Sequence, residues 1–297
     1  MATIIDGNEV AQTIRDDLSD AIDTLAAEGV SPGLATVLMS DDPASETYVS
    51  MKQRACEEVG IEGIHVELPA DADAETLYET IDDLNEDDAV DGILVQMPVP
   101  DHVDKAIVLE RVDPNKDVDG FHPENVGLLV AGTPRFRPCT PHGVQKLLEA
   151  VDVDPEGKDV VIVGRSDIVG KPLANLLIQK ADGANATVTV CHSRTDDLAA
   201  HTSRADIVIA AVGVPELITG DMISDGTTVI DVGVNRVDAD TEKGYELVGD
   251  VEFDSVEKKA AYITPVPGGV GPMTIAMLLY NTVKAAGERH DIAVTLP

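Results

Sequence analysis

The sequence predicts an α/β protein with two domains, each built on a parallel sheet. Short runs of Val, Ile and Leu alternate along the 297 residues with amphipathic helical patterns. Such alternation is typical of parallel strands joined by covering helices. A region rich in proline and glycine, residues 113–141, interrupts this series and indicates the domain junction. A second α/β series then begins with a strand at residues 160–163.

The first series contains a long helix, followed by three strands with helices between them. Apolar residues three and four positions apart predict a helix over residues 8–28, ended by Gly29. Asp42 is expected to cap the next helix, with Pro43 at its first position. The expected strands are 34–39, 64–68 and 93–96, and the helices between them are 43–59 and 74–84.

The second series and the end of the chain complete the expected fold. The last helix, at residues 273–286, is expected to return to the first domain. We therefore expect one domain made of residues 1–138 and 272–297, and another made of residues 139–271. The other expected elements are helices at 141–150, at 172–180 and near Leu198, and strands at 160–163, 187–191, 207–210 and 228–231.

The charge is strongly negative, and it limits the partners of the protein. Asp and Glu number 55 against 21 Lys and Arg, which gives a net charge of −34. Such a field repels nucleic acid and anionic membranes, so neither is expected as a partner. Concentrated salt makes a dispersed acidic surface tolerable, because it screens repulsion beyond ~3 Å at 1 M. The composition therefore predicts a halophilic source.

The sequence gives no sign of export, membrane insertion or metal binding. Its N-terminus lacks a basic region followed by a long apolar stretch, and no apolar run approaches the ~20 residues that cross a membrane. Cys56, Cys139 and Cys191 are odd in number, far apart and without C-x-x-C spacing. This pattern argues against a disulfide framework and a zinc site. We expect a cytoplasmic protein without a metal.

A strand, a tight turn and a helix follow one another at residues 160–178. Gly164 ends the strand, and Gly170 and Pro172 open the helical pattern. Unpaired backbone N–H groups at a helix start attract phosphate, and the helix dipole strengthens the attraction. The spacing falls short of the G-x-G-x-x-G fingerprint. A nucleotide site and a turn whose glycines serve only packing therefore remain alternatives.

The end of the next strand bears on the choice of nucleotide. NAD-selective sites place an acidic residue there for the ribose hydroxyls, whereas this chain has Ser193 and Arg194. Together with Arg165, these side chains favour the 2′-phosphate of NADP. The alternative is a polar loop in which Arg194 offsets the surrounding acid.

Tyr48 and Lys52 are four residues apart on the helix predicted at 43–59, so they share one face. Lys52 falls within the apolar arc of that helix. A lysine in this position either reaches water at the end of its stem or is held where its pKa falls, which suits an acid or base. Both alternatives are open at this point.

Polar residues also follow the third expected strand. Gln96 stands at the carboxyl end of that strand, where open α/β sheets place ligands, and its amide can orient an amine or satisfy loop backbone. Asp117 and Asp119 lie in a loop rich in turn residues. A carboxylate there can make a local turn or recognise a ring that carries adjacent N–H donors.

The segment at residues 264–274 contains three prolines and three glycines and ends at a helix start. Proline fixes the backbone path, and glycine lets backbone approach another group closely. A rigid platform for a flat ring and a turn between domains are compatible interpretations.

Seven motifs, taken together, resemble the bifunctional methylenetetrahydrofolate dehydrogenase/methenyltetrahydrofolate cyclohydrolase family over nearly the whole chain. They are Ser45-Glu-Thr-Tyr-Val-Ser-Met-Lys52, Val95-Gln-Met-Pro98, Lys116-Asp-Val-Asp-Gly-Phe-His-Pro123, Pro138-Cys-Thr-Pro141, Gly164-Arg-Ser-Asp-Ile-Val-Gly-Lys-Pro172, Val229-Ile-Asp-Val-Gly233 and Pro265-Val-Pro-Gly-Gly-Val-Gly-Pro-Met-Thr274.

The resemblance implies a fold, two reactions and an assembly. The fold would be an N-terminal parallel-sheet folate domain and a Rossmann-like NADP domain, with folate in the cleft between them and two subunits in a homodimer. The family oxidises 5,10-methylenetetrahydrofolate with NADP and hydrolyses the methenyl product to 10-formyltetrahydrofolate. NADP is thus the implied cofactor, and tetrahydrofolates are the implied substrates.

The resemblance also implies roles for particular residues. Lys52 would carry protons in the hydrolysis, Gln96 would orient its amine, Tyr48 would stack on the substrate, and Asp119 would hold the pterin. The NADP site would be lined by Gly164, Arg165, Ser166, Ser193 and Val234. The other substrate-binding residues would be Val95, Met97, Pro265, Pro267, Gly268, Gly269, Val270, Gly271 and Pro272.

Three other functions are weaker alternatives. They are a dehydrogenase without cyclohydrolase activity, an NADP-sensing protein without turnover, and a shikimate-type oxidoreductase. Tyr48, Lys52 and Gln96 together argue against the first, and the presence of the lysine argues against the second. The third leaves Gln96 and the proline and glycine segment unexplained. Residues 212–217 imply nothing about activity. Lys116 and Lys171 cannot offset the negative field at a polyanionic folate tail, so we expect substrate affinity to depend on salt.

Overall fold

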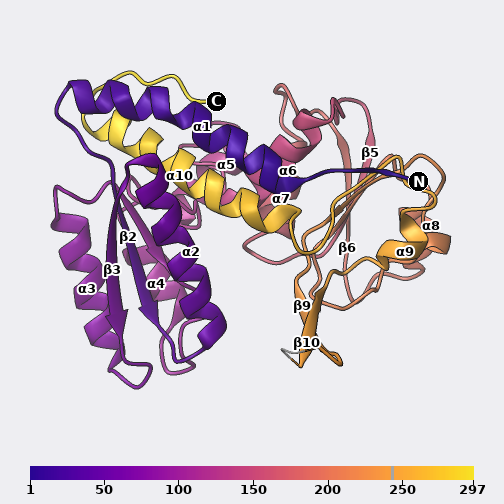
Figure 1. Cartoon of the computed structure of the whole chain (residues 1–297), viewed down its shortest axis with the longest axis horizontal. Helices are drawn as coiled ribbons and strands as arrows, with labels where there is room; N and C mark the ends of the chain where they lie inside the picture. The colour runs from indigo at the N-terminus through magenta and orange to yellow at the C-terminus, as the bar shows by residue number, and fades with distance from the viewer. Residues whose placement is uncertain (242–243) are drawn as a thin grey trace. The chain divides into compact units, whose positions relative to one another are not determined.

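The computed structural model describes residues 1–241 and 244–297, and it divides into two compact units. The first, here called the three-stranded unit, comprises Gln12–Cys139 and Ile275–Pro297. The second, the six-stranded unit, comprises Met1–Ala11 and Thr140–Thr274. Figure 1 shows the elements of each unit along the chain.

The sheet of the three-stranded unit is parallel and carries helices on both faces. Strand β2 (Gly33–Met39) lies between β3 (Glu62–Leu68) and β4 (Gly92–Val95). One face packs against α3 (Ala74–Glu86), because Val37 and Met39 share a core with residues of that helix. On the other face Gly63 lies opposite Cys56 of α2 (Pro43–Val59). Figure 1 shows α2 and α3 running alongside these strands.

The last helix, α10 (Val270–Arg289), braces the three-stranded unit. Asn281 Nδ2 donates to Val118 O at 2.7 Å, and Arg289 Nη1 lies 2.5 Å from Asp91 Oδ1. Both contacts tie the helix to loops that flank β4. The unit also contains α4 (Lys105–Arg111), α5 (Pro123–Ala131) and all but the first turn of α1 (Gly7–Ala27).

Residues 113–141, expected to be a junction, are largely an ordered part of this unit. Asp117 makes a parallel bridge with Ile93, and α5 follows within the same region. The unit continues to Cys139. Proline and glycine here build tight turns around a short helix, which composition alone cannot distinguish from a linker.

The sheet of the six-stranded unit is parallel, and its strand order reverses at β5. The order is β6-β5-β7-β8-β11-β1, so β5 lies between the strand that follows it and β7. Open α/β sheets bind ligands at the carboxyl ends of the strands at such a switch point. The strands are β5 (Asp159–Val163), β6 (Thr187–Cys191), β7 (Ile207–Ala210), β8 (Thr228–Asp231), β11 (Tyr262–Ile263) and β1 (Thr3–Ile4).

Helices and one hairpin complete the six-stranded unit. The antiparallel hairpin consists of β9 (Asn235–Asp238) and β10 (Tyr245–Val248). The helices are α6 (Cys139–Ala150), α7 (Gly170–Leu177), α8 (Leu198–Thr202), η1 (Gly220–Met222) and α9 (Phe253–Val256).

The start of the chain differs from the expected domain division. Residues 1–11 were expected in the N-terminal domain, yet they group with the six-stranded unit. The reason is that β1 pairs with β11, in the register Thr3 to Tyr262 and Ile4 to Ile263. A strand of two residues has no periodic pattern that a sequence could reveal.

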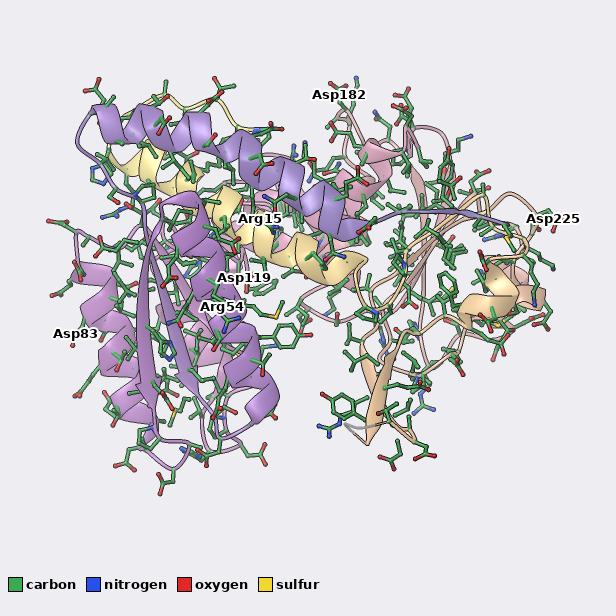
Figure 2. All side chains as sticks on the ribbon, in the orientation of Figure 1. Arg15, Arg54, Asp83, Asp119, Asp182 and Asp225 are labelled. Carbon is green, nitrogen blue, oxygen red and sulfur yellow. The ribbon has the colours of Figure 1, made fainter. Side chains whose placement is uncertain are left out.

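Acidic side chains cover the surface of both units. Figure 2 shows carboxylates pointing outward, among them Asp83 in one unit and Asp182 and Asp225 in the other, and all three are exposed. Within residues 1–241 and 244–297, no helix has the length and apolarity to span a membrane.

Candidate active site

Lys52 is a buried lysine in the three-stranded unit. Its side chain projects from α2, only 8 % of the residue is exposed, and Nζ donates to Gln96 Oε1 at 3.0 Å. Burial lowers the pKa of Lys52, because desolvation disfavours the ammonium form. The amine therefore does not reach water along the surface, and of the two alternatives for Lys52 the buried one is correct.

Gln96 is oriented by the backbone around it. Its N–H donates to Val37 O at 2.8 Å, which holds it at the end of β4. Its Nε2 donates to Met97 O at 2.8 Å, so Oε1 is the atom that faces Lys52. The glutamine thus satisfies loop backbone and holds the amine at the same time.

Asp119 lies beside α2 in the same unit, as Figure 2 shows, and is partly exposed. Burial raises the pKa of Asp119, and the positive charge of Lys52 acts in the opposite direction. Conversely, the charge of Asp119 raises the pKa of Lys52 against the larger effect of burial. The thiol of Cys139, which is 1 % exposed, donates to the carbonyl oxygen of Val118, the residue before Asp119, at 3.4 Å. The loop and the helix therefore bring an amine, an amide and a carboxylate together.

Asp117, two residues away, shapes the loop that carries Asp119. Its Oδ2 accepts from His122 N and Asn125 Nδ2, both at 2.8 Å, and its Oδ1 accepts from Phe121 N at 3.2 Å. Burial raises the pKa of Asp117 to about 7. The local interpretation is therefore the correct one for Asp117.

Lys116 also has a structural role. It is 2 % exposed, and its Nζ donates to three carbonyl oxygens at the end of α3, those of Leu84, Asn85 and Asp87, at 2.7–3.0 Å. A cation at a helix C-terminus satisfies carbonyls that lack an intrahelical partner. The amine of Lys116 therefore stabilises the fold.

The remaining predicted substrate residues of this unit are Tyr48, on the same helix as Lys52, and Val95 and Met97, on either side of Gln96 in the sequence. Tyr48, one turn before Lys52, is 43 % exposed. Val95, the last residue of β4, is buried, whereas Met97 is partly exposed. The ring of Tyr48 is thus accessible to a ligand on the face of α2 that carries Lys52.

The proline and glycine segment belongs to the six-stranded unit. A Cβ on Gly7 would lie 1.7 Å from Gly269 O, so the two backbones touch. Gly268 has φ +100°, a conformation that favours glycine. Among the predicted substrate residues here, Gly269 and Val270 are buried, Pro267 and Gly271 are exposed, and Pro265, Gly268 and Pro272 lie between these extremes.

Gly164 forms the turn at the carboxyl end of β5. Its φ is +131°, and a Cβ there would lie 2.1 Å from Ala211 O. Gly170 is equally restricted, because its Cβ would lie 2.3 Å from Gly164 O. The turn after β5, the start of α7 and the residue after β7 therefore pack backbone against backbone at the switch point.

The sequence predicts unpaired N–H groups at the start of α7, but in the structure the turn before the helix accepts from them. Ser166 Oγ accepts from Val169 N at 3.1 Å and from Gly170 N at 3.4 Å, while Lys171 N donates to Ser166 O at 3.0 Å. The serine therefore caps the helix from within the turn. Exposed side chains also lie at this edge.

Three of these side chains lie at strand ends. Arg165 follows β5, Ser193 follows β6 and Val234 follows β8, and all three are exposed. Arg194 is exposed beside Ser193. A guanidinium and a hydroxyl at these positions suit a phosphate-bearing ribose better than an acidic residue would.

Sequence reasoning missed one pair of buried carboxylates in this unit. Asp231 is 3 % exposed and Asp250 is 0 % exposed, and both accept hydrogen bonds from loop backbone beside the switch point. Asp231 lies within the motif at residues 229–233, whereas no sequence pattern marks Asp250 except the glycine before it. Within the described residues, no group of three or more His, Cys, Asp or Glu could hold a metal ion.

Two family models cover most of the chain. Residues 5–119 match the catalytic domain of tetrahydrofolate dehydrogenase/cyclohydrolase, and residues 138–290 match its NAD(P)-binding domain. The chain belongs to the tetrahydrofolate dehydrogenase/cyclohydrolase family. Like the family, it combines a dehydrogenase and a cyclohydrolase.

Relatives of this dehydrogenase/cyclohydrolase match it along its whole length. The bifunctional protein FolD of Natronomonas pharaonis is 73 % identical over 297 residues, which is all of both chains. A FolD of Haloarcula marismortui is 71 % identical, again over all of both chains. These haloarchaeal relatives fit the prediction of a halophilic source.

Solved structures of the family share the two-domain α/β fold. The bifunctional FolD of Campylobacter jejuni has a TM-score of 0.92 at 49 % identity, covering 97 % of this chain and all of that one. The enzyme of Trypanosoma brucei, solved with NADP cofactor and an inhibitor, has a TM-score of 0.92 at 43 % identity, covering 98 % of this chain and 99 % of that one.

Proposed function

We propose that this enzyme oxidises 5,10-methylenetetrahydrofolate with NADP and hydrolyses the methenyl product to 10-formyltetrahydrofolate, with Lys52 as its proton carrier. The observation that carries the assignment is the buried amine of Lys52, held by Gln96 and lying near Asp119. Of the groups around it, this amine has the chemistry to take a proton and return it within one turnover.

The hydrolysis needs a base first and an acid afterwards. Water attacks the methenyl carbon, and the neutral amine of Lys52 takes its proton. The resulting ammonium then gives a proton to the N5 nitrogen as the bond between N5 and the carbon breaks. The hydroxyl left on that carbon loses its own proton to water, which leaves the formyl group on N10 and releases one proton overall. Burial lowers the pKa of the amine, which favours the neutral form that the first proton transfer needs. Gln96 keeps the amine aimed during both transfers.

The oxidation depends on placing the cofactor. NADP, when bound, accepts the hydride of the methylene carbon. Gly164, Arg165, Ser166, Ser193 and Val234 would hold it: Gly164 lets backbone pack closely at the switch point, Arg165 and Ser193 offer a charge and a hydroxyl, and Ser166 fixes the turn. Their contribution is orientation, since the cofactor carries the redox chemistry.

Each proposed substrate residue has a role that suits its chemistry. Tyr48 would stack on the aminobenzoyl ring, and Asp119 would accept from the adjacent N–H donors of the pterin. Val95 and Met97 would flank the reacting atoms beside Gln96. Residues 265–272 would lie along the folate, where proline and glycine limit the motion of the backbone. With residues 1–11 moved to the second domain because β1 pairs with β11, the proposed functional domains are residues 12–138 with 272–297 and residues 1–11 with 139–271.

We further propose a homodimer that works in the cytoplasm and binds neither nucleic acid nor membranes. The net charge of −34 supports the exclusion of polyanionic partners. Cys56, Cys139 and Cys191 are buried free thiols, as expected in a reducing compartment. Light scattering at molar KCl tests the dimer, and a monomer at micromolar concentration would contradict it.

The decisive experiment is a pair of assays on Lys52→Met, with Lys105→Met as the matched control. Lys105 is an exposed lysine of the same unit. General acid–base catalysis contributes roughly 10²- to 10⁴-fold, so cyclohydrolase activity should fall by that factor. NADP-dependent formation of the methenyl product should survive in part, and the control should match the wild type.

Other outcomes distinguish the alternatives. Equal loss of both activities with an intact fold means that Lys52 chiefly positions substrate. A wild-type protein that oxidises the substrate without hydrolysing the product is a dehydrogenase alone. If the wild type binds NADP but performs neither reaction, it is a sensor.

A further inference from the structure

We propose that Asp250 is a positioning residue for NADP: its buried carboxylate sets the loop after β7 against which the nicotinamide half of the cofactor binds. The inference rests on the proposed function, because it concerns the cofactor of that reaction. The loop in question, called the β7 loop, consists of Val212, Gly213 and Val214.

The carboxylate of Asp250 gathers four donors. Oδ2 accepts from Val212 N at 2.6 Å and from Gly213 N at 3.0 Å, and Oδ1 accepts from Val214 N at 2.9 Å. Asn235 Nδ2 also donates to Oδ1 at 2.9 Å. Three successive N–H groups directed at one anion form a nest, which fixes the backbone of a loop. The β7 loop is therefore shaped around an internal anion.

A second buried carboxylate holds Asp250 in place. Asp231, the last residue of β8, accepts from Asp250 N at 2.9 Å and from Val251 N at 3.0 Å. Glycines leave room for both groups: a Cβ on Gly233 would lie 2.2 Å from Asp250 Oδ1, and one on Gly249 would lie 1.7 Å from Asp231 Oδ2. A strand end thus fixes Asp250, and Asp250 fixes the loop.

The β7 loop lies at the switch point of the sheet. Val163 of β5 is paired with Ala210 of β7, and Ala211 N donates to Val163 O at 2.7 Å. Ala211 O is the atom that a Cβ on Gly164 would strike. Val232 N donates to Ala210 O at 2.8 Å, so the residues before Val234 flank the other side. The loop therefore lies between two segments proposed to hold the cofactor.

This position separates the β7 loop from the residues proposed for the adenosine half. Ser193 and Arg194 follow β6, on the side of β5 opposite to β7. A dinucleotide bound across the switch point places its two halves over the two sides of the central strand. Val214 is 45 % exposed and Val234 is 45 % exposed, so the β7 side presents apolar surface suited to a ring.

Asp250→Asn is the informative variant. Asparagine keeps the shape, but its one oxygen can serve two of the donors, and its NH₂ group faces the other two. We expect the Kd of NADP, measured by isothermal titration calorimetry, to rise at least tenfold. The Kd of 2′,5′-ADP, which is the adenosine half alone, should stay within twofold. Cyclohydrolase activity, which needs no NADP, should also stay within twofold.

Asp206→Asn is the matched control. Asp206 Oδ2 accepts from Asp159 N at 2.9 Å, so it is also an aspartate that binds backbone, but at the amino ends of the same strands. Both Kd values should match the wild type. Asn235→Ala, which removes one donor to Asp250, should raise the Kd of NADP about threefold and serves if Asp250→Asn does not fold.

Each remaining outcome overturns the proposal. If NADP and 2′,5′-ADP weaken together, or if cyclohydrolase activity falls in parallel, Asp250 supports the unit as a whole and has no selective part in positioning. An unchanged Kd of NADP means that the β7 loop does not touch the cofactor. A wild type that binds no NADP instead refutes the proposed function, which the wild-type titration alone decides.

Discussion

Two buried charges, one in each unit, have different surroundings. In the three-stranded unit, Lys52 meets the single oxygen of a glutamine side chain, and burial lowers its pKa. In the six-stranded unit, Asp250 accepts three backbone N–H groups and an amide. A charge with few partners changes its protonation readily, whereas a charge surrounded by donors fixes the donors in place. Lys52 is therefore suited to proton transfer, and Asp250 is suited to fixing the conformation of a loop.

Gln96→Glu tests the role of Lys52 in this comparison, and we expect it to have the largest effect on activity. A carboxylate beside Nζ favours the ammonium, so the pKa of Lys52 rises. The attack of water requires the neutral amine, so cyclohydrolase activity at neutral pH falls and recovers as pH rises. We expect the rate at pH 7 to fall by roughly 10- to 100-fold. The pH profile of the cyclohydrolase rate measures it.

Gln53→Glu is the control for this change, because Gln53 is a partly buried neighbour of Lys52 on α2. Its profile should resemble that of the wild type. A Gln96→Glu profile that does not move would mean that the titration of Lys52 does not limit the hydrolysis.

Gly164→Ala tests the role of the six-stranded unit in binding NADP. An alanine there has an unfavourable φ of +131° and a Cβ 2.1 Å from Ala211 O. Backbone strain of this kind costs roughly 1–3 kcal/mol, and the shifted turn should raise the KM for NADP about tenfold. Cyclohydrolase activity should stay within twofold.

The matched control is Gly127→Ala in α5, where a Cβ would meet nothing within 4 Å. Neither activity should change. If Gly164→Ala lowers cyclohydrolase activity as much as dehydrogenase activity, the two units do not have separate functions.

Lys116→Met should alter stability more than catalysis. The ammonium serves three carbonyls at the end of α3, and a buried carbonyl left without a donor costs roughly 1–3 kcal/mol. We expect the free energy of unfolding in urea to fall by about 3 kcal/mol while the KM for folate is preserved. Lys171→Met, which removes an exposed pair with Asp167, should cost less than about 1 kcal/mol. A raised KM in the first variant would show that Lys116 binds substrate.

Salt should produce the smallest and most diffuse effect. Between about 0.1 and 1 M KCl the screening length falls from about 10 to 3 Å, so repulsion between surface carboxylates weakens. The free energy of unfolding should rise, and the KM for the polyanionic folate should fall a few-fold. Equal stability in dilute buffer, or a flat KM, would count against an acidic surface adapted to salt.

The sequence predicted what periodicity and local spacing encode. The long helices and the buried strands were located within a few residues, because their apolar patterns are regular. Lys52 was identified because a lysine on an apolar arc is unusual. Its partner Gln96 is 44 positions away, and only its place at a strand end suggested the contact.

Other features depend on contacts that no local pattern records. Asp250 approaches the β7 loop across a hairpin, 36 to 38 positions from its backbone donors. Nor did the sequence indicate that the hydroxyl of Ser166 accepts from Val169 N and Gly170 N. Lys116 lies in the same motif as Asp119, the residue expected to hold the pterin. Its own amine, however, donates to carbonyl oxygens at the end of α3. Tertiary contacts decided the roles of Asp250 and Lys116, and the conformation of a local turn decided that of Ser166.

The path of the chain has a consequence for synthesis on the ribosome. Strand β1, at residues 3–4, pairs with β11, at residues 262–263. The three-stranded unit likewise includes Ile275–Pro297 together with Gln12–Cys139. Because a ribosome delivers the N-terminus first, neither unit can close until almost all of the polypeptide has been made. A nascent chain released early would leave an open sheet edge in one unit and an uncovered core in the other, so premature termination yields no functional half.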